Sequence, residues 1–141
     1  MGEIVRERRR KPGLAPLTVT TFLFLLILPV LALQRIAEAA YFYHVLGYVL
    51  GLSVVAYLLY RGDKRRAQLG EWRVPESTLH VVELLGGWPG AFLAQRMLRH
   101  KNAKGRYQLK FWAIVAVHQL VLFEFLNHWT YSQRLLSPLF R

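Results

Sequence analysis

The sequence predicts an all-α integral membrane protein with three transmembrane helices and one re-entrant or interfacial helical hairpin. Long uncharged runs recur along a chain of 141 residues, of which 54% are hydrophobic and only 19% are charged. A soluble domain of this size needs more charge to cover its surface. We expect a basic tail over residues 1–13 and a single helical membrane domain over residues 14–141. The absence of cysteine excludes disulfides and thiolate metal sites.

The first apolar run covers residues 14–33 and contains no charged side chain. A helix of that length is about 30 Å long, which matches the hydrocarbon thickness of a bilayer. Pro29 is expected to kink this helix near its outer end. A cleaved signal peptide is the alternative, because basic residues precede the run. Signal cores are only about 7–15 residues long, so a retained membrane anchor is favoured.

Two more runs are long enough to span. Residues 39–60 are uncharged, and they include Gly47 and Gly51 at the GxxxG spacing that permits close helix packing. Residues 111–131 form the last span and are interrupted by Glu124.

A fourth apolar stretch, residues 79–98, is broken at its centre by the sequence Gly-Gly-Trp-Pro-Gly over residues 86–90. Glycine and proline disfavour a continuous helix there. We therefore expect a helix over residues 76–85, a turn, and a second helix over residues 91–99 that returns to the same side. A fourth, kinked span is the alternative, with Gly86, Gly87 and Gly90 available for helix packing.

The distribution of basic residues predicts the orientation. Five Lys or Arg residues lie in residues 1–13, one in 34–38, five in 61–73 and six in 96–110. Because cytoplasmic loops carry the Lys/Arg excess, the N-terminus and both basic loops are expected in the cytoplasm. The hairpin satisfies this distribution, whereas a fourth span would place one basic loop outside.

Residues 73–111 contain a set of marks typical of one family: Arg73, Pro75, Glu76, Leu79, Gly86, Gly87, the Pro89-Gly90-Ala91 triplet, the Arg99-His100-Lys101 triplet, Lys104 and Phe111. This motif region resembles DUF1294, a domain of unknown function in small bacterial membrane proteins. The resemblance implies a location in the bacterial inner membrane and implies no reaction. Some members of the family also carry a cold-shock-like domain that binds nucleic acid. Only the resemblance to those members implies a nucleic-acid partner for this chain.

A cationic cluster follows the broken apolar stretch. The guanidinium fork of Arg and the ammonium of Lys both suit phosphate, so the cluster is a candidate site for a phosphate-bearing ligand, anionic lipid or a partner. The alternative is ordinary anchoring of a cytoplasmic loop. The candidate residues are Arg73, Arg99, His100, Lys101, Lys104 and Arg106.

Acidic and histidine side chains inside or beside the apolar runs are candidates for handling ions or protons. Glu76, His80 and Glu83 fall nearly on one helical face, and Glu124 and His128 share another. The alternatives are that Glu76 favours a helix N-terminus, that Glu83 pairs with an Arg, and that the last pair lies at headgroup depth. We expect no metal site and no cofactor.

These features favour a non-enzymatic inner-membrane binding or accessory protein whose basic cytoplasmic face engages anionic lipid, a phosphate-bearing ligand or a protein partner. A small ion- or proton-coupled transporter, or a subunit of one, is the second interpretation. A membrane enzyme is the third, because the sequence has no nucleophile constellation and no phosphate loop. The expected partners are the phospholipid bilayer, anionic lipids, and either another protein or a second copy of the chain.

Overall fold

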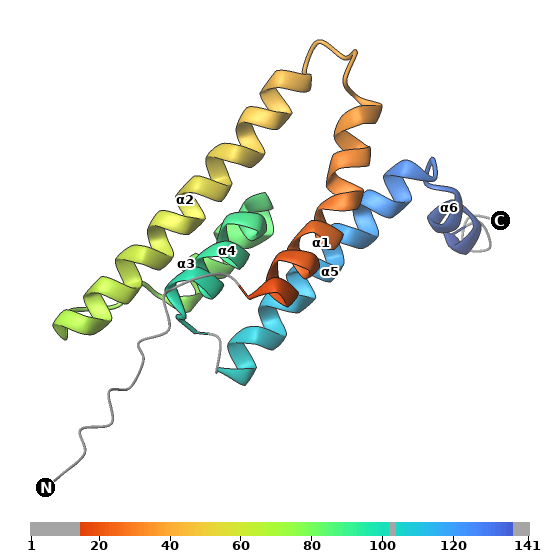
Figure 1. Ribbon diagram of the computed structural model, residues 1–141. Helices are drawn as coiled ribbons and strands as arrows, with labels where there is room; N and C mark the ends of the chain where they lie inside the picture. Colours follow the sequence, from red (N-terminus) through yellow and green to blue (C-terminus); the bar gives the residue numbers. More distant parts are fainter. Residues whose placement is uncertain (1–14, 102–103, 137–141) are drawn as a thin grey trace, which may run out of the picture.

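The computed structural model describes residues 15–101 and 104–136, and every regular element in these ranges is helical (Figure 1). In chain order the elements are α1 (Pro16–Arg35), α2 (Phe42–Leu69), α3 (Glu76–Val82), the π-helical turn η1 (Glu83–Gly87), α4 (Trp88–Leu98), α5 (Gly105–Leu126) and α6 (Thr130–Leu136). The basic tail expected over residues 1–13 lies outside the described residues.

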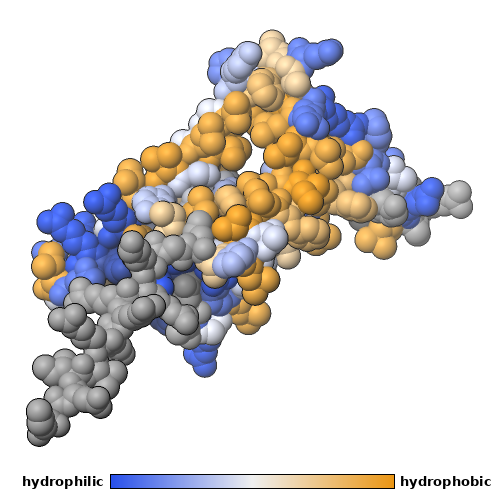
Figure 2. Space-filling view, in the orientation of Figure 1, coloured by the Kyte–Doolittle hydropathy of each residue, from blue (hydrophilic) through white to orange (hydrophobic). Residues whose placement is uncertain are grey.

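Three helices, α1, α2 and α5, are long and apolar enough to cross a membrane. In Figure 2 hydrophobic residues occupy the middle of the molecule, and hydrophilic residues gather toward its two ends. Such a large apolar surface is unfavourable in water, whereas lipid chains solvate it well. The prediction of an all-α membrane protein is confirmed.

The helix α2 is longer than its apolar run. It continues past Tyr60 to Leu69 and ends at Gly70, which has the left-handed φ of 69° that glycine tolerates. The prediction of a loop from Arg61 to Arg73 is therefore wrong over most of its length. As a result, Asp63 lies on a helix, one turn beyond Tyr60.

The proline inside α1 is accommodated by a contact with α5. Pro29 has no N–H to donate to the carbonyl of Leu25, four residues earlier. The side-chain amide of Gln119 donates to that carbonyl instead, over 2.9 Å. A helix breaker at membrane depth is tolerated when a neighbouring helix satisfies the freed carbonyl. The contact also fixes α1 against α5.

The elements α3, η1 and α4 form a hairpin beside α2 (Figure 1). Both ends of the hairpin contact Asp63. The N–H of Val74 donates to Oδ1 over 3.0 Å, and Nε2 of His100 lies 2.8 Å from Oδ2. The tip reaches the first half of α2, where the hydroxyl of Tyr48 donates to the carbonyl of Leu85 over 3.1 Å. The chain thus enters and leaves at one end of the bundle, as expected for a re-entrant hairpin and not for a fourth span.

Glycines allow the hairpin to turn and to approach α2. Gly86 has a φ of 117°, a conformation that a side chain would strain. A Cβ on Gly90 would lie 1.8 Å from the carbonyl oxygen of Ser53, and a Cβ on Gly87 would lie 2.8 Å from that of Leu52. The backbones of α2 and the hairpin are therefore in direct contact. By contrast, a Cβ added at Gly47 or Gly51 would meet nothing within 4 Å among the described residues.

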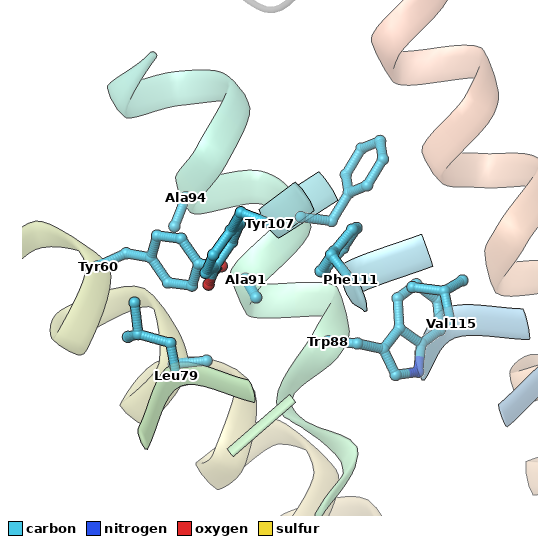
Figure 3. Packing of buried hydrophobic residues seen from close by; sticks show 10 residues of the cluster. Tyr60, Leu79, Trp88, Ala91, Ala94, Tyr107, Phe111 and Val115 are labelled. Carbon is cyan, nitrogen blue, oxygen red and sulfur yellow. The ribbon is translucent and has the colours of Figure 1, made fainter. Parts of the chain in front are cut away.

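The apolar core lies between α2, the hairpin and α5. Figure 3 shows Trp88 and Ala91 of α4 on the side of Phe111 and Val115 of α5, and Ala94 of α4 beside Tyr60. These six side chains are buried. Small alanines on α4 let the neighbouring helices approach closely, as is typical of helix packing in membranes. This core covers a set of buried polar groups. These groups lie at the end of the bundle where the hairpin begins, and we call that end of the bundle the basic end.

Candidate functional site

A fully buried glutamate marks the centre of the candidate site. Glu83 lies in η1, and its side chain has no solvent exposure. Its Oε1 accepts hydrogen bonds from the hydroxyl of Tyr60 in α2 and, over 3.0 Å, from the hydroxyl of Tyr107 in α5. Its Oε2 lies 2.7 Å from Nδ1 of His80 in α3. The carboxyl group therefore joins α2, α3 and α5.

The two tyrosine hydroxyls also contact each other. Figure 3 shows Tyr60 and Tyr107 converging beside α4. From α4 the amide of Gln95 donates to the hydroxyl of Tyr60 over 2.8 Å, and the amide of Gln108 in α5 donates to Oε1 of Gln95 over 2.7 Å. The result is a hydrogen-bonded chain from Gln108 through Gln95 and Tyr60 to Glu83. We call these residues, together with His80 and Tyr107, the polar core.

His80 lies at the end of this series of hydrogen bonds, and one of its ring nitrogens has no partner among the described residues. Its ring stacks on Tyr107 with a centroid distance of 4.3 Å, and Nδ1 faces the Glu83 carboxyl group. The other nitrogen, Nε2, is buried without a hydrogen-bond partner among the described residues. A carboxylate that accepts from Nδ1–H fixes the tautomer and leaves a lone pair on Nε2. The imidazole is thus oriented with one free nitrogen.

A second buried acid lies nearer the basic end. Asp63 of α2 has no solvent exposure, and its Oδ2 lies 2.8 Å from Nε2 of His100, 3.1 Å from Nζ of Lys101 and 3.6 Å from the guanidinium of Arg73. Its other oxygen accepts from the Val74 N–H. A buried carboxylate is stable only when such partners replace its lost hydration. Asp63 therefore contacts both ends of the hairpin and holds them against α2.

The backbone after α4 directs His100 and Lys101 toward Asp63. Arg99 and Lys101 have positive φ values of 48° and 62°, which are uncommon for residues with a side chain. Each such residue costs of order 1 kcal/mol. The ion pairs with Asp63 offset this cost, because they form only when the chain turns sharply here.

Lys101 lies between the buried Asp63, the ring of Tyr107 and the partly exposed Glu76. Its ammonium lies 4.8 Å from the centroid of the Tyr107 ring and 3.9 Å from Oε1 of Glu76. Glu76 also accepts from Lys104 over 2.6 Å. The hydrogen bond from Lys104 lowers the pKa of Glu76 below its ordinary value of 4.5, and Lys101 contributes to the same effect. An ordered row of charges thus connects the polar core with the basic end.

The predicted phosphate-binding residues divide into two groups in the structure. His100 and Lys101 are largely occupied by Asp63, while Arg73 and Lys104 pair with acids and remain about half exposed. Arg99 and Arg106 are exposed, and no interaction engages them among the described residues. Only part of the cationic cluster is therefore free to meet a ligand.

The structure separates the acids that share one face of the hairpin helix in the sequence. It brings His80 and Glu83 together and places Glu76 beside lysines at the basic end. The expectation that Glu83 pairs with an Arg is wrong, because its partners are His80 and two tyrosines. Glu83 lies seven residues beyond Glu76, about 10 Å deeper along the helix. At that depth, Glu83 is too far from the basic loops to pair with an Arg side chain.

The last predicted pair, Glu124 and His128, lies at the opposite end of the bundle. Glu124 accepts from the hydroxyl of Ser132 over 3.1 Å. His128 contacts the guanidinium of Arg35, which also donates to the carbonyls of Phe125 and Leu126. Glu124 and His128 thus have separate partners, and neither joins the polar core. They hold α6 and the end of α1 against α5.

Sequence reasoning missed five members of these clusters: Tyr60, Asp63, Gln95, Tyr107 and Gln108. A signal for two of them was present, because Tyr60 and Asp63 are three residues apart and therefore share a helical face. Asp63 stands alone among basic residues, which draws attention to the charges instead of the acid. Within the described residues no group of three or more His, Asp or Glu side chains is arranged to hold a metal ion.

The model of one known protein family matches this region of the chain. Residues 53–107 match the model of the family described as protein of unknown function (DUF1294). The predicted resemblance to DUF1294 is confirmed over this segment. The matched segment starts earlier than the motif region expected from residue 73. It covers the end of α2, the hairpin and the start of α5, and so includes every residue of the two acid clusters except Gln108. No curated protein and no solved structure matches the chain.

Proposed function

We propose that the protein is a non-enzymatic membrane-embedded binding protein whose basic end engages the headgroups of anionic phospholipids. The observation that supports this most directly is the hairpin. Because it enters and leaves at the basic end, the cations before and after it gather there instead of on two sides. Each Lys or Arg near an anionic surface contributes about 1 kcal/mol to binding. The exposed cations at this end that make no ion pair within the described residues are Arg61, Arg65, Arg66, Arg99, Arg106 and Lys110.

The charge balance of the buried groups supports the same proposal. Asp63 and Glu76 neutralise the cations nearest the hairpin, so those cations serve folding. Arg99 and Arg106 are held just outside these pairs and keep their hydrogen-bond donors for a ligand. A guanidinium group binds phosphate oxygens in a bidentate way. The ion pairs of Asp63 and Glu76 position the exposed arginines, and the guanidinium groups of these arginines stay available for a ligand.

In this proposal the basic end faces the cytoplasm of a bacterium and the chain lies in the inner membrane. The support is the excess of Lys and Arg at one end, which is retained on the cytoplasmic side during insertion. Five further basic residues precede α1 in the sequence and add to the excess before the first span.

The test uses protein reconstituted in nanodiscs with mixed phosphatidylglycerol and phosphatidylcholine, followed by analysis of the lipids that remain bound in mild detergent. The wild type should enrich phosphatidylglycerol. A variant with Gln at positions 65, 66, 99 and 106 should lose most of this enrichment, whereas a variant with Lys at the same positions should keep it. Equal lipid composition for the wild type and the Gln variant would refute the proposal.

A second candidate function is proton coupling in a transporter or transporter subunit. Two observations favour it: Glu83 is fully buried, and the His80 nitrogen beyond it has no partner among the described residues. Ionisable groups at membrane depth commonly belong to proton pathways. In sealed liposomes, this function requires a pH-driven flux that Glu83→Gln abolishes while the variant keeps its fold. A wild-type flux equal to that of protein-free liposomes would exclude it.

A further inference from the structure

An apolar cleft lies on the far side of the hairpin tip from the polar core. Its volume is about 780 Å³, which lies within the range of ligand-binding cavities. It is walled by α1, α2 and α5, and Trp88, Pro89 and Gly90 of the hairpin tip line its floor. Figure 2 shows the hollow between α1 and α2, bordered by hydrophobic residues.

The cleft exists because the hairpin stops halfway. Below the tip, α4 fills the space between α2 and α5. Above it, α1 and α2 stay apart until the short loop that joins them (Figure 1), and no other described element lies between them. Along α2 the cleft extends from Val45 to Tyr57, which is about 18 Å of helix. The hydrocarbon region of a bilayer is about 30 Å thick, so the cleft covers little more than one leaflet.

The walls of the cleft carry no charged side chain among its lining residues. Of the few polar residues there, His118 already uses Nδ1 in a contact of 2.9 Å with the carbonyl of Ile114. A polar or charged ligand would lose its hydration in this cleft without gaining partners. A hydrocarbon chain loses nothing, because lipid tails and aliphatic side chains are equally apolar.

The depth of the cleft selects among apolar occupants. A spanning helix from another protein would run into the hairpin tip at mid-membrane, because Trp88 and Pro89 close the lower end. The acyl chain of a phospholipid ends at about that depth. At the end away from the hairpin tip, Trp129 lines the cleft, as tryptophan does at headgroup level, and the exposed Arg35 is fixed close by through Phe125 and His128.

We propose that this cleft is a binding site for one acyl chain of a phospholipid from the leaflet opposite the basic end, with the lipid phosphate beside Arg35. The site is independent of the headgroup binding proposed for the basic end. The lipid would complete the interior that the hairpin leaves unfilled, and would hold α1 and α2 apart.

The test combines mass measurement with cleft-filling variants. Native mass spectrometry of the full chain in mild detergent should detect one retained phospholipid per chain. Val49→Trp, which fills the cleft, should remove that mass increment, whereas Val55→Trp, on an exposed part of α2 outside the cleft lining, should keep it. The variant with four Gln residues at the basic end should also keep it.

A photoreactive phosphatidylglycerol with a diazirine near the end of one acyl chain gives a second measurement on the wild type. Crosslinks should map to the floor and walls of the cleft, around Leu93 and Val49. The proposal is overturned if no lipid is retained, if both Trp variants retain it equally, or if the crosslinks spread evenly over the lipid-facing surfaces. A dimer that Val49→Trp dissociates would overturn it as well, because a second copy would then occupy the cleft.

Discussion

The two halves of the interior, on either side of the hairpin tip, are built by different means. Toward the basic end, buried acids, tyrosines and glutamines bind α2, the hairpin and α5 to one another through directional contacts. Toward the opposite end the interior is an apolar cleft, and the polar contacts there include the Gln119 bond to α1 and, at the end of the helices, the contacts of Arg35 and Glu124. The hairpin therefore determines which half of the bundle is held together by directional contacts.

This comparison implies an order of sensitivity. Changes that displace the hairpin should unfold the basic half, whereas changes in the opposite half should alter lipid occupancy and leave the fold intact. The expected loss of stability is largest for the backbone contact at the tip and smallest for the ion pair of Glu76.

Gly90→Leu should have the largest effect. Its Cβ alone would lie 1.8 Å from the Ser53 carbonyl, so the hairpin cannot dock against α2 without a backbone shift. We expect a loss of about 3 kcal/mol or more, with thermal unfolding in detergent as the measurement. Gly51→Ala is the matched control, because nothing lies within 4 Å of its Cβ position and alanine favours helix. Equal stability of the two variants would show that the contact is not close.

Asp63→Asn should be nearly as damaging. The change leaves Lys101, whose side chain is 3% exposed, without its close counter-charge. Removing one partner of a buried ion pair costs about 3–5 kcal/mol. Limited proteolysis should then cut the chain near the hairpin base, and Asp63→Glu should restore part of the protection. Unchanged proteolysis of Asp63→Asn would mean that Asp63 does not hold the hairpin against α2.

Glu83→Gln should have an intermediate effect, because the amide keeps a carbonyl acceptor for both tyrosines but replaces the oxygen that faces His80 with an NH2 group. Hydrogen bonds to charged groups contribute about 1.5–3 kcal/mol each. We expect destabilisation in that range with no change in metal content, measured by unfolding and elemental analysis. Stoichiometric zinc or iron in the wild type, lost in the variant, would contradict this account.

Glu76 should give the smallest effect, and one that depends on pH. Its pKa in the folded protein is lowered, chiefly by the hydrogen bond from Lys104, so the ionised form is favoured on folding. The stability it adds is present above its ordinary pKa of 4.5 and is lost as the pH falls through the lower folded pKa. The stability difference between the wild type and Glu76→Gln should therefore be larger at pH 7 than in acid. A difference that grows in acid would contradict the assignment.

The sequence predicted the spans and the hairpin because membranes impose simple rules. A bilayer requires long uncharged helices, and the Gly-Gly-Trp-Pro-Gly break between two basic segments leaves few arrangements. The partner of Glu83 could not be predicted in the same way. Tyr60 and Tyr107 come from helices on either side of the hairpin, and only the depth of insertion decides which groups meet Glu83. The role of Asp63 depends likewise on the left-handed backbone at Arg99 and Lys101.

Cysteine accessibility distinguishes the re-entrant path of the hairpin from a fourth span. The chain has no cysteine, so single substitutions can be read without background. Gln68→Cys precedes the hairpin, Arg106→Cys follows it, and Glu38→Cys lies between α1 and α2. With an impermeant thiol reagent on sealed vesicles, positions 68 and 106 should react from the same side and position 38 from the other. Reaction of positions 68 and 106 from opposite sides would establish a fourth span and contradict the account.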